Sequence, residues 1–259
     1  MLKITDLVKR YGSGEPVLKN LDLTVAGETV ISVIGSSGAG KSTLLRCINR
    51  LVEPTSGSIV LNGTELTKLK GRDLRMARRK IGMVFQSFNL VDRLTVMENV
   101  MSGRLGYLTT WAAISRRYPK DDIRRAYELM ERVGISHYAD TRADGLSGGE
   151  RQRVGVVRAL MQQPEILLAD EPTASLDPRT SEQIMQLLRD LAGELKLPVL
   201  INIHNVTEAK QYTDRIVGMR YGRIIFDDAP SALTEDAMEA IYSGSPAADR
   251  EGAGLKETA

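Results

Sequence analysis

Hydrophobic and polar residues alternate along three stretches near the start of the chain. The alternation covers residues 2–9, 17–25 and 57–62, and it is typical of antiparallel strands with one buried face. Residues 29–34 instead form a continuous apolar run, which is typical of a strand buried on both faces. A helical pattern over 41–51 follows this run, so we expect a strand, a short loop and a helix in succession.

The second half of the chain repeats this alternation of strand and helix patterns. Apolar runs at 165–170 and 198–203 predict two more buried strands, and the pattern near 180–195 between them predicts a helix. Residues 216–219 and 223–226 predict a closing hairpin. Strands that alternate with helices indicate an α/β fold with a parallel sheet.

A long helical and polar stretch separates these two halves. From about residue 87 to 163 the pattern predicts a helical lobe inserted into the α/β core. The end of the chain, 244–259, is rich in Ala, Gly, Glu and Lys and has little apolar content, so we expect it to be disordered. The sequence therefore predicts one domain over residues 1–243 and a tail.

Composition narrows the class of protein. With 35 Lys and Arg against 33 Asp and Glu, the net charge of +2 gives no support for a nucleic-acid partner, which usually requires a strong basic excess. The single cysteine, Cys47, excludes an internal disulfide and fits a reducing compartment. No apolar run approaches the roughly 18 residues needed to span a membrane, and the N-terminus lacks the apolar centre of a signal peptide. We expect a cytoplasmic chain that other chains would bring to any membrane.

A glycine-rich loop carries the clearest chemistry. Gly35-x4-Gly40-Lys41-Ser42 lies directly after an expected strand and before an expected helix, which is the context of a phosphate-binding loop. Its backbone N–H groups and the helix dipole favour phosphate groups. Lys41 should reach the β- and γ-phosphates of ATP, and Ser42 should ligate Mg²⁺. The residues expected to bind the nucleotide here are Gly35, Ser36, Ser37, Gly38, Ala39, Gly40, Lys41, Ser42 and Thr43.

Two carboxylates end the apolar run that starts at Ile166. Asp170, at the strand end, is placed to hold Mg²⁺, often through water. Glu171 follows it and is placed to polarise an attacking water molecule. Because a phosphate-binding loop precedes them in the chain, the pair predicts hydrolysis of ATP.

With residues 146–152 (Leu-Ser-Gly-Gly-Glu-Arg-Gln) and 166–177 included, the chain resembles the nucleotide-binding domains of ABC transporters over about residues 1–243. The resemblance implies a P-loop (RecA-like) core, an N-terminal antiparallel β-subdomain and an inserted helical lobe. It also implies that two copies enclose two ATP molecules. The residues that would close over the partner chain's ATP are Ser147, Gly148 and Gly149.

The resemblance also implies roles for residues outside these motifs. Tyr11 would stack on adenine, and Gln86 would contact Mg²⁺ and the attacking water while linking the core to the lobe. Residues 174–177 would communicate across the dimer, and His204 would contact the γ-phosphate as a third catalytic group beside Glu171 and Gln86. The other histidine, His137, has no such context, so we expect a surface residue.

The segment 102–118 is the most specific part of the resemblance. It contains Trp111, Tyr107 and Tyr118, and its Gly-Arg-Leu-Gly-Tyr sequence looks like the ATP-binding subunits of bacterial phosphonate importers. Residues 45–59 and 214–228 are similar to the same subunits. This implies a peripheral protein on the cytoplasmic face of the membrane, with transmembrane permease subunits and an extracytoplasmic substrate-binding protein as partners. The three aromatic residues either pack inside the lobe or contact the permease.

Other readings remain open at this stage. Importers of phosphite or another oxyanion are close relatives, and residues 83–90 and 150–152 also resemble lipoprotein-release and macrolide-type exporters. A soluble ABC ATPase in DNA repair, translation or an enzyme assembly is a further alternative. Repair-type members carry a long coiled coil and translation-type members carry two cassettes, whereas this sequence shows one cassette and no heptad run. A small-molecule kinase would not explain residues 146–152. A basic stretch over 72–80 has helical spacing and indicates a solvated helix face.

Overall fold

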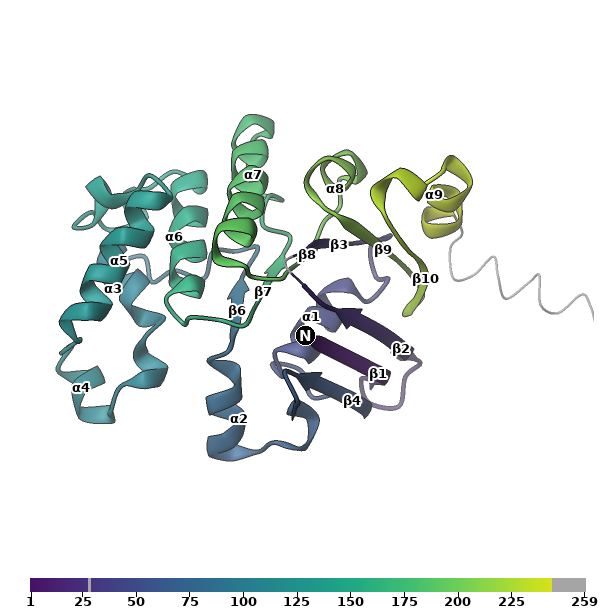
Figure 1. Ribbon diagram of the computed structural model, residues 1–259, viewed down its shortest axis with the longest axis horizontal. Coiled ribbons are helices and arrows are strands. Elements are labelled where there is room, and N and C mark those ends of the chain that lie inside the picture. Colours follow the sequence, from purple (N-terminus) through teal and green to yellow (C-terminus); the bar gives the residue numbers. More distant parts are fainter. Residues whose placement is uncertain (28, 244–259) are drawn as a thin grey trace, which may run out of the picture.

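The first part of the chain forms a four-stranded antiparallel sheet (Figure 1). The structure is a computed structural model that describes residues 1–27 and 29–243. The predicted disorder of 244–259 lies outside the described residues. The strand order is β2-β1-β4-β5. The strands are β1 (Leu2–Arg10), β2 (Pro16–Val25), β4 (Ser56–Leu61) and β5 (Thr64–Glu65). The alternating patterns at the start of the chain are confirmed as antiparallel strands.

Six strands form the central sheet, in the order β10-β9-β3-β8-β7-β6. The pairs from β9 to β6 are parallel, and β10 adds to β9 as an antiparallel hairpin. The strands are β3 (Val30–Ile34), β6 (Ile81–Val84), β7 (Ile166–Asp170), β8 (Val199–Asn202), β9 (Arg215–Arg220) and β10 (Arg223–Asp228). The predicted buried strands and closing hairpin are confirmed, whereas β6 was not predicted.

The helices surround this sheet and form a separate group at one end of the molecule (Figure 1). Those following strands of the central sheet are α1 (Lys41–Ile48), α7 (Pro178–Leu195), α8 (Val206–Tyr212) and α9 (Glu235–Tyr242). The others are α2 (Gly71–Arg78), α3 (Val96–Ser102), α4 (Thr110–Ile114), α5 (Lys120–Arg132) and α6 (Gly148–Leu160). Short 3₁₀ helices are η1 (Leu66–Lys68), η2 (Leu105–Tyr107), η3 (Ser136–Tyr138), η4 (Ala143–Gly145) and η5 (Pro230–Ala232).

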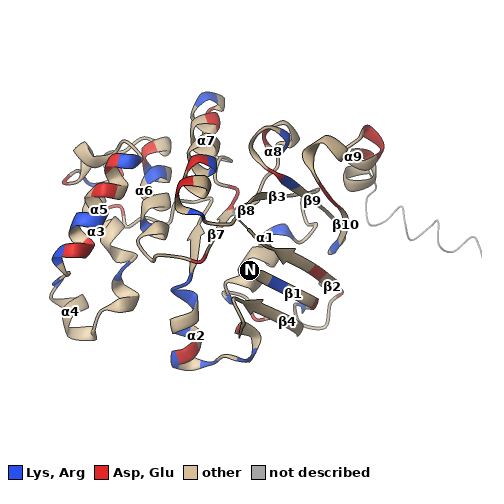
Figure 2. Ribbon diagram, viewed as in Figure 1, with Lys and Arg blue, Asp and Glu red and all other residues tan. Residues whose placement is uncertain are grey.

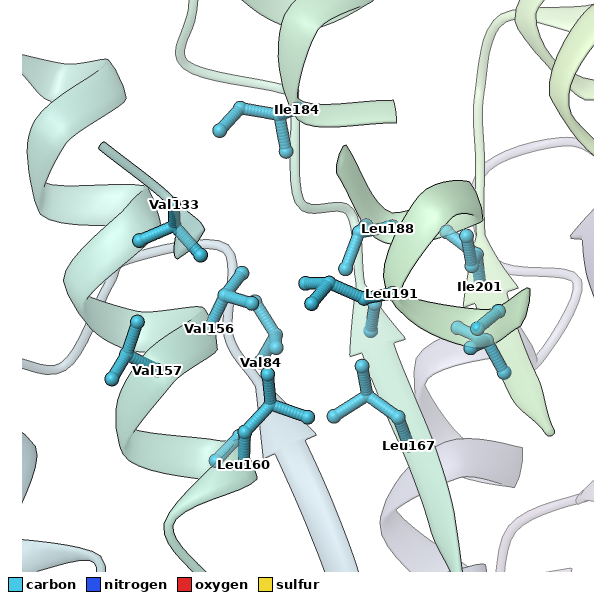
Figure 3. Packing of buried hydrophobic residues seen from close by; sticks show 14 of the residues in the cluster. Val84, Val133, Val156, Val157, Leu160, Leu167, Ile184, Leu188, Leu191 and Ile201 are labelled. Atoms are coloured by element: carbon cyan, nitrogen blue, oxygen red, sulfur yellow. The ribbon is translucent and has the colours of Figure 1, made fainter. Parts of the chain in front are cut away.

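The central sheet is buried on both faces, as its continuous apolar strands predict. Successive side chains of a strand point to opposite faces, so Leu167 packs in one hydrophobic cluster and Leu168 in another. In the first cluster, Ile184 and Leu188 of α7 pack over β7, beside Val156 of α6 (Figure 3). The second cluster joins the sheet to α1 and to the antiparallel sheet. The phosphate-binding loop is therefore anchored between two layers of the core.

Helix α1 ends three residues before the expected position. Arg50 adopts a left-handed backbone conformation with φ 51°, which ends a right-handed helix. Its side chain is buried, pairs with Glu53 at 2.6 Å and donates to the carbonyl oxygen of Leu66. This contact with a distant segment fixes the end of the helix. Cys47, in the last turn, is a buried free thiol, and burial raises its pKa to about 11.

Within the described part of the chain, no helix combines the length and the apolar character needed to cross a bilayer.

Candidate nucleotide site

The glycine-rich loop connects the end of β3 to the first turn of α1. Gly35 has φ 146°, and a Cβ at this position would overlap the carbonyl oxygen of Met219, so only glycine fits. Gly40 forms the N-cap of α1 with φ 102°, a conformation that L side chains rarely adopt. The loop encloses a cavity of about 200 Å³. Its lining residues are Val17, Ser37, Gly38, Ala39, Gly40, Lys41, Ser42, Thr43, Glu171 and His204.

Lys41 is held inside this loop by backbone carbonyl groups of the loop itself. Its side chain is buried, and its Nζ donates to the carbonyl oxygens of Gly35 at 2.7 Å and Ser36 at 3.1 Å. Burial lowers the pKa of Lys41, while the negative charges of Glu171 and Asp170 oppose this shift. Phosphate oxygens can replace the carbonyl contacts and supply the full opposite charge that the loop lacks.

A cluster of oxygen-bearing side chains lies behind the loop. Asp170 is buried at the end of β7 and accepts hydrogen bonds from the Ser42 hydroxyl at 2.7 Å and from Asn202 Nδ2 at 2.8 Å. Arg46 lies 3.5 Å from its other carboxylate oxygen. Asn202 Oδ1 is buried and has no protein partner within the described residues. This donor set fits Mg²⁺, which prefers oxygen ligands and keeps several water molecules.

Asn202 and Arg46 were not predicted from the sequence. Asn202 ends the strand beside β7, and the parallel register places it opposite Asp170. The signal that could have found it is the polar residue within the apolar run at 198–203. For Arg46, the sequence offers no signal beyond a basic residue near the end of the expected helix, two residues before α1 ends.

Glu171 and His204 meet at the rim of the same cavity. His204 Nε2 lies 2.6 Å from Glu171 Oε1, and each residue lies just beyond the end of its strand, β7 or β8. Glu171 has φ 51°, a left-handed conformation that costs energy for a non-glycine residue and concentrates at functional sites. Its N–H donates to the carbonyl oxygen of Asn202 at 3.1 Å. The strand ends thus bring the two expected catalytic groups into direct contact.

Ser147, Gly148 and Gly149 lie in a different cavity, of about 540 Å³. Ser147 is the N-cap of α6 and forms a capping box with Glu150. The Glu150 N–H donates to the Ser147 hydroxyl at 3.4 Å, and the Ser147 N–H donates to Glu150 Oε2 at 2.7 Å. The same cavity is lined by Ser175, Leu176 and Asp177 from the predicted 174–177 loop. It shares no lining residue with the phosphate-loop cavity. One copy of the chain therefore carries two separate cavities, one at the glycine-rich loop and one at the start of α6.

His137 is exposed, as expected, but it lines this second cavity. Its ring lies 4.0 Å from that of Tyr138. A hydrogen bond with Glu150 raises the pKa of Tyr138 and lowers that of Glu150. Nothing in the sequence around His137 indicated this position, because packing of η3 beside the start of α6 creates it.

Gln86 and Tyr11 lie outside both cavities as far as the described residues show. Gln86 is exposed two residues after β6, whose neighbour in the sheet is β7. Tyr11 is about half exposed, with the Lys9 ammonium 4.6 Å from its ring centre. The structure thus places both residues at strand ends but gives neither a contact with the loop cavity.

Comparisons with curated proteins agree with this geometry. Residues 18–174 match the family model described as ABC transporter. A phosphonates import ATP-binding protein, PhnC 1, from Ruegeria sp. (strain TM1040) is 81% identical over 250 residues, which are 96% of this chain and 97% of that protein. The phosphonates import ATP-binding protein PhnC from Nitratidesulfovibrio vulgaris is 56% identical over 94% of this chain and 92% of that protein.

Solved structures share the whole fold. A dimeric post-hydrolysis state of the ATP-binding cassette MJ0796, bound to ADP and Pi, has a TM-score of 0.77 and 34% identity, covering 89% of this chain and 99% of that chain. CbiO1 from Clostridium perfringens, part of the transporter complex cbiONQ, has a TM-score of 0.79 and 30% identity, covering 92% of each chain. With its glycine-rich loop, its strand-end carboxylates and the family match over residues 18–174, the chain belongs to the ABC transporter family as an ATP-binding cassette.

Proposed function

We propose that this chain is the ATP-hydrolysing subunit of an ABC importer for phosphonates. The assignment of phosphonate as the substrate is supported by the 81% identity, over nearly the full length of both chains, to a phosphonates import ATP-binding protein. A subunit that powers transport does not itself contact the transported molecule, so the two cavities described above bear on ATP and do not identify the substrate.

ATP binds with its phosphates in the loop from Gly35 to Thr43 in this proposal. Lys41 contacts the β- and γ-phosphates, and the adenine stacks on Tyr11. Mg²⁺, when bound, neutralises developing charge between the phosphates, and the residues that would hold it are Ser42, Asp170 and Gln86. What supports this set is the hydrogen-bonded Ser42–Asp170 pair and the unpartnered Asn202 Oδ1 beside it.

Hydrolysis depends on Glu171, which accepts a proton from the attacking water. His204 holds the Glu171 carboxylate through their 2.6 Å contact and faces the γ-phosphate. Gln86 follows the neighbouring strand and completes the group of catalytic residues once nucleotide binding draws it to the cavity.

Two copies of the chain form the complete site in this proposal. Because Ser147, Gly148 and Gly149 lie in a cavity separate from the loop, they reach an ATP only on a partner chain. Residues 1–243 form the nucleotide-binding domain, with a helical lobe over about 87–163. ATP favours the closed dimer through these extra contacts, and opening after hydrolysis moves the lobes. The lobes drive a permease at the cytoplasmic face of the membrane, which receives phosphonate from an extracytoplasmic binding protein.

The test is the ATPase rate of the chain co-purified with its permease in lipid, with the matching binding protein added. We expect a phosphonate to stimulate the rate above phosphite, phosphate and no ligand, and a complex carrying Glu171→Gln to show no stimulation. Equal ATPase rates with all ligands would contradict the assignment of phosphonate as the substrate. If the chain co-purified with no membrane protein, the result would favour an ATPase that does not act in transport.

A further inference from the structure

Helix α2 belongs to a strongly basic segment that the ATP cycle does not use. Residues 68–80 contain seven Lys and Arg and one acid, Asp73, although the chain as a whole has a net charge of only +2. Figure 2 shows blue Lys and Arg segments along α2, together with tan residues and a red acidic segment. Three of the seven basic residues lie on the short helix α2, and the other four lie in the residues on either side of it.

Four arginines of this segment line a cavity of about 550 Å³ between α2 and the stretch from η2 to α4. They are Arg72, Arg75, Arg78 and Arg79. The other lining residues are Leu105, Gly106, Leu108, Thr110 and Ala113. No carboxylate lines the cavity, and within residues 1–27 and 29–243 none of the four arginines forms an ion pair.

Two of the arginines position the cavity wall, and two are available to a ligand. Arg78 donates to the backbone carbonyl oxygens of Asn49 and Arg50. Arg79 lies 4.8 Å from the ring centre of Tyr107, which fixes α2 against η2. Arg72 and Arg75 are exposed on the same helix. Guanidinium groups pair with phosphate through two parallel hydrogen bonds, so the cavity suits a phosphate-bearing anion.

The surroundings of the cavity are apolar and exposed. On α4, Trp111 is 75% exposed and Ile114 is 71% exposed, and Met76 on α2 is 46% exposed. Leu105, which lines the cavity, is also exposed. Tryptophan and aliphatic side chains beside basic residues are typical of protein surfaces that enter the interface of a membrane. A free phosphate ion would gain nothing from these side chains.

We propose that α2 and residues 105–114 form a binding site for the headgroup phosphate of an anionic phospholipid, with Trp111 and Ile114 inserted among the neighbouring lipids. A cluster of four to eight basic residues favours an anionic leaflet, and segment 68–80 contains seven. This inference rests on the proposed function in one respect, because that function places the chain at a membrane. The site would give the cassette a contact with lipid that is independent of the permease.

The test uses the full chain without permease and measures its co-sedimentation with vesicles of phosphatidylcholine, with or without phosphatidylglycerol. We expect binding only to vesicles that contain phosphatidylglycerol, and weakening by salt. The double variant Arg72→Gln/Arg75→Gln should bind about 30-fold more weakly, since each basic residue near an anionic surface contributes about 1 kcal/mol. The control Lys3→Gln/Arg223→Gln removes the same charge from exposed positions on β1 and β10 and should bind normally.

A second variant separates lipid insertion from charge alone. Trp111→Ser leaves the net charge unchanged and should also weaken vesicle binding, whereas unchanged binding would overturn the inserted orientation. If Arg72→Gln/Arg75→Gln and Lys3→Gln/Arg223→Gln lost vesicle binding equally, the binding would reflect the general charge of the chain, and the specific site would be rejected.

Other occupants give different results. If the chain bound inorganic phosphate through Arg72 and Arg75 but did not bind vesicles, the ligand of the site would be a free anion and not a lipid. If Arg72→Gln/Arg75→Gln lost co-purification with the permease in detergent but still bound vesicles, the site would be a contact with the permease and not with lipid. The vesicle assay contains neither permease nor phosphonate, so a negative result rejects the lipid site and leaves phosphonate import to its own test.

Discussion

Replacing Glu171 with Gln is expected to stop ATP hydrolysis and to trap the chain as an ATP-bound dimer. Glu171 lines the phosphate-loop cavity and contacts His204 at 2.6 Å, and an amide of the same size cannot accept a proton from water. Loss of a general base lowers a rate by about 10²–10⁴-fold. The loop backbone and Lys41 are untouched, so ATP still binds and the dimer that it favours cannot open through hydrolysis.

Light scattering of the purified variant, with ATP and Mg²⁺ or with ADP, measures this outcome. The control is Glu182→Gln, the same chemical change at an exposed position on α7, which should hydrolyse ATP at the normal rate. A Glu171→Gln chain that stays monomeric at saturating ATP, or that hydrolyses ATP normally, would contradict the role of Glu171.

Replacing Lys41 with Ala is expected to abolish hydrolysis by removing a charge from the centre of the loop. Each charge-assisted hydrogen bond to phosphate is worth about 1.5–3 kcal/mol. Two such bonds correspond to about 10²–10⁴-fold in kcat/KM, at a factor of ten for each 1.4 kcal/mol or so. Both the affinity for ATP and the rate should fall, because the same ammonium contacts the ground state and the developing charge.

Steady-state ATPase assays and nucleotide titrations test this prediction. Lys41 also donates to the carbonyl oxygens of Gly35 and Ser36, so circular dichroism must establish that the variant is folded. Lys3→Ala, on the exposed face of β1, is the matched control and should retain full activity. A folded Lys41→Ala chain with an unchanged ATPase rate would remove the basis for the phosphate site.

Local patterns were enough to predict most of the central sheet. The apolar runs that became β3, β7 and β8 are buried on both faces, so their composition alone distinguishes them from solvent-exposed segments. Strand β6, Ile81–Val84, is as short as β8, but it contains Gly82 and directly follows a basic stretch, so it does not stand out as an apolar run. The end of α1 was also missed, because it depends on Arg50 reaching the carbonyl oxygen of Leu66.

In the candidate site, too, some residues could be predicted from the sequence and others could not. The loop, Asp170 and Glu171 follow from motif and strand position, since residues close in sequence form them. Asn202 becomes part of the site only through the parallel register that places it opposite Asp170. His137 reaches the Ser147 cavity only through packing of η3 beside α6. Sequence patterns do not contain such contacts between segments.

The central claim is that each ATP is enclosed by two chains, and Ser147→Arg in the Glu171→Gln background tests it most directly. Ser147 is the N-cap of α6, and loss of a cap costs only about 0.5–2 kcal/mol, so circular dichroism should show a folded chain. Light scattering with ATP and Mg²⁺ should find Glu171→Gln as a dimer and the double variant as a monomer that still binds ATP. A double variant that forms the ATP-dependent dimer as readily would contradict the account.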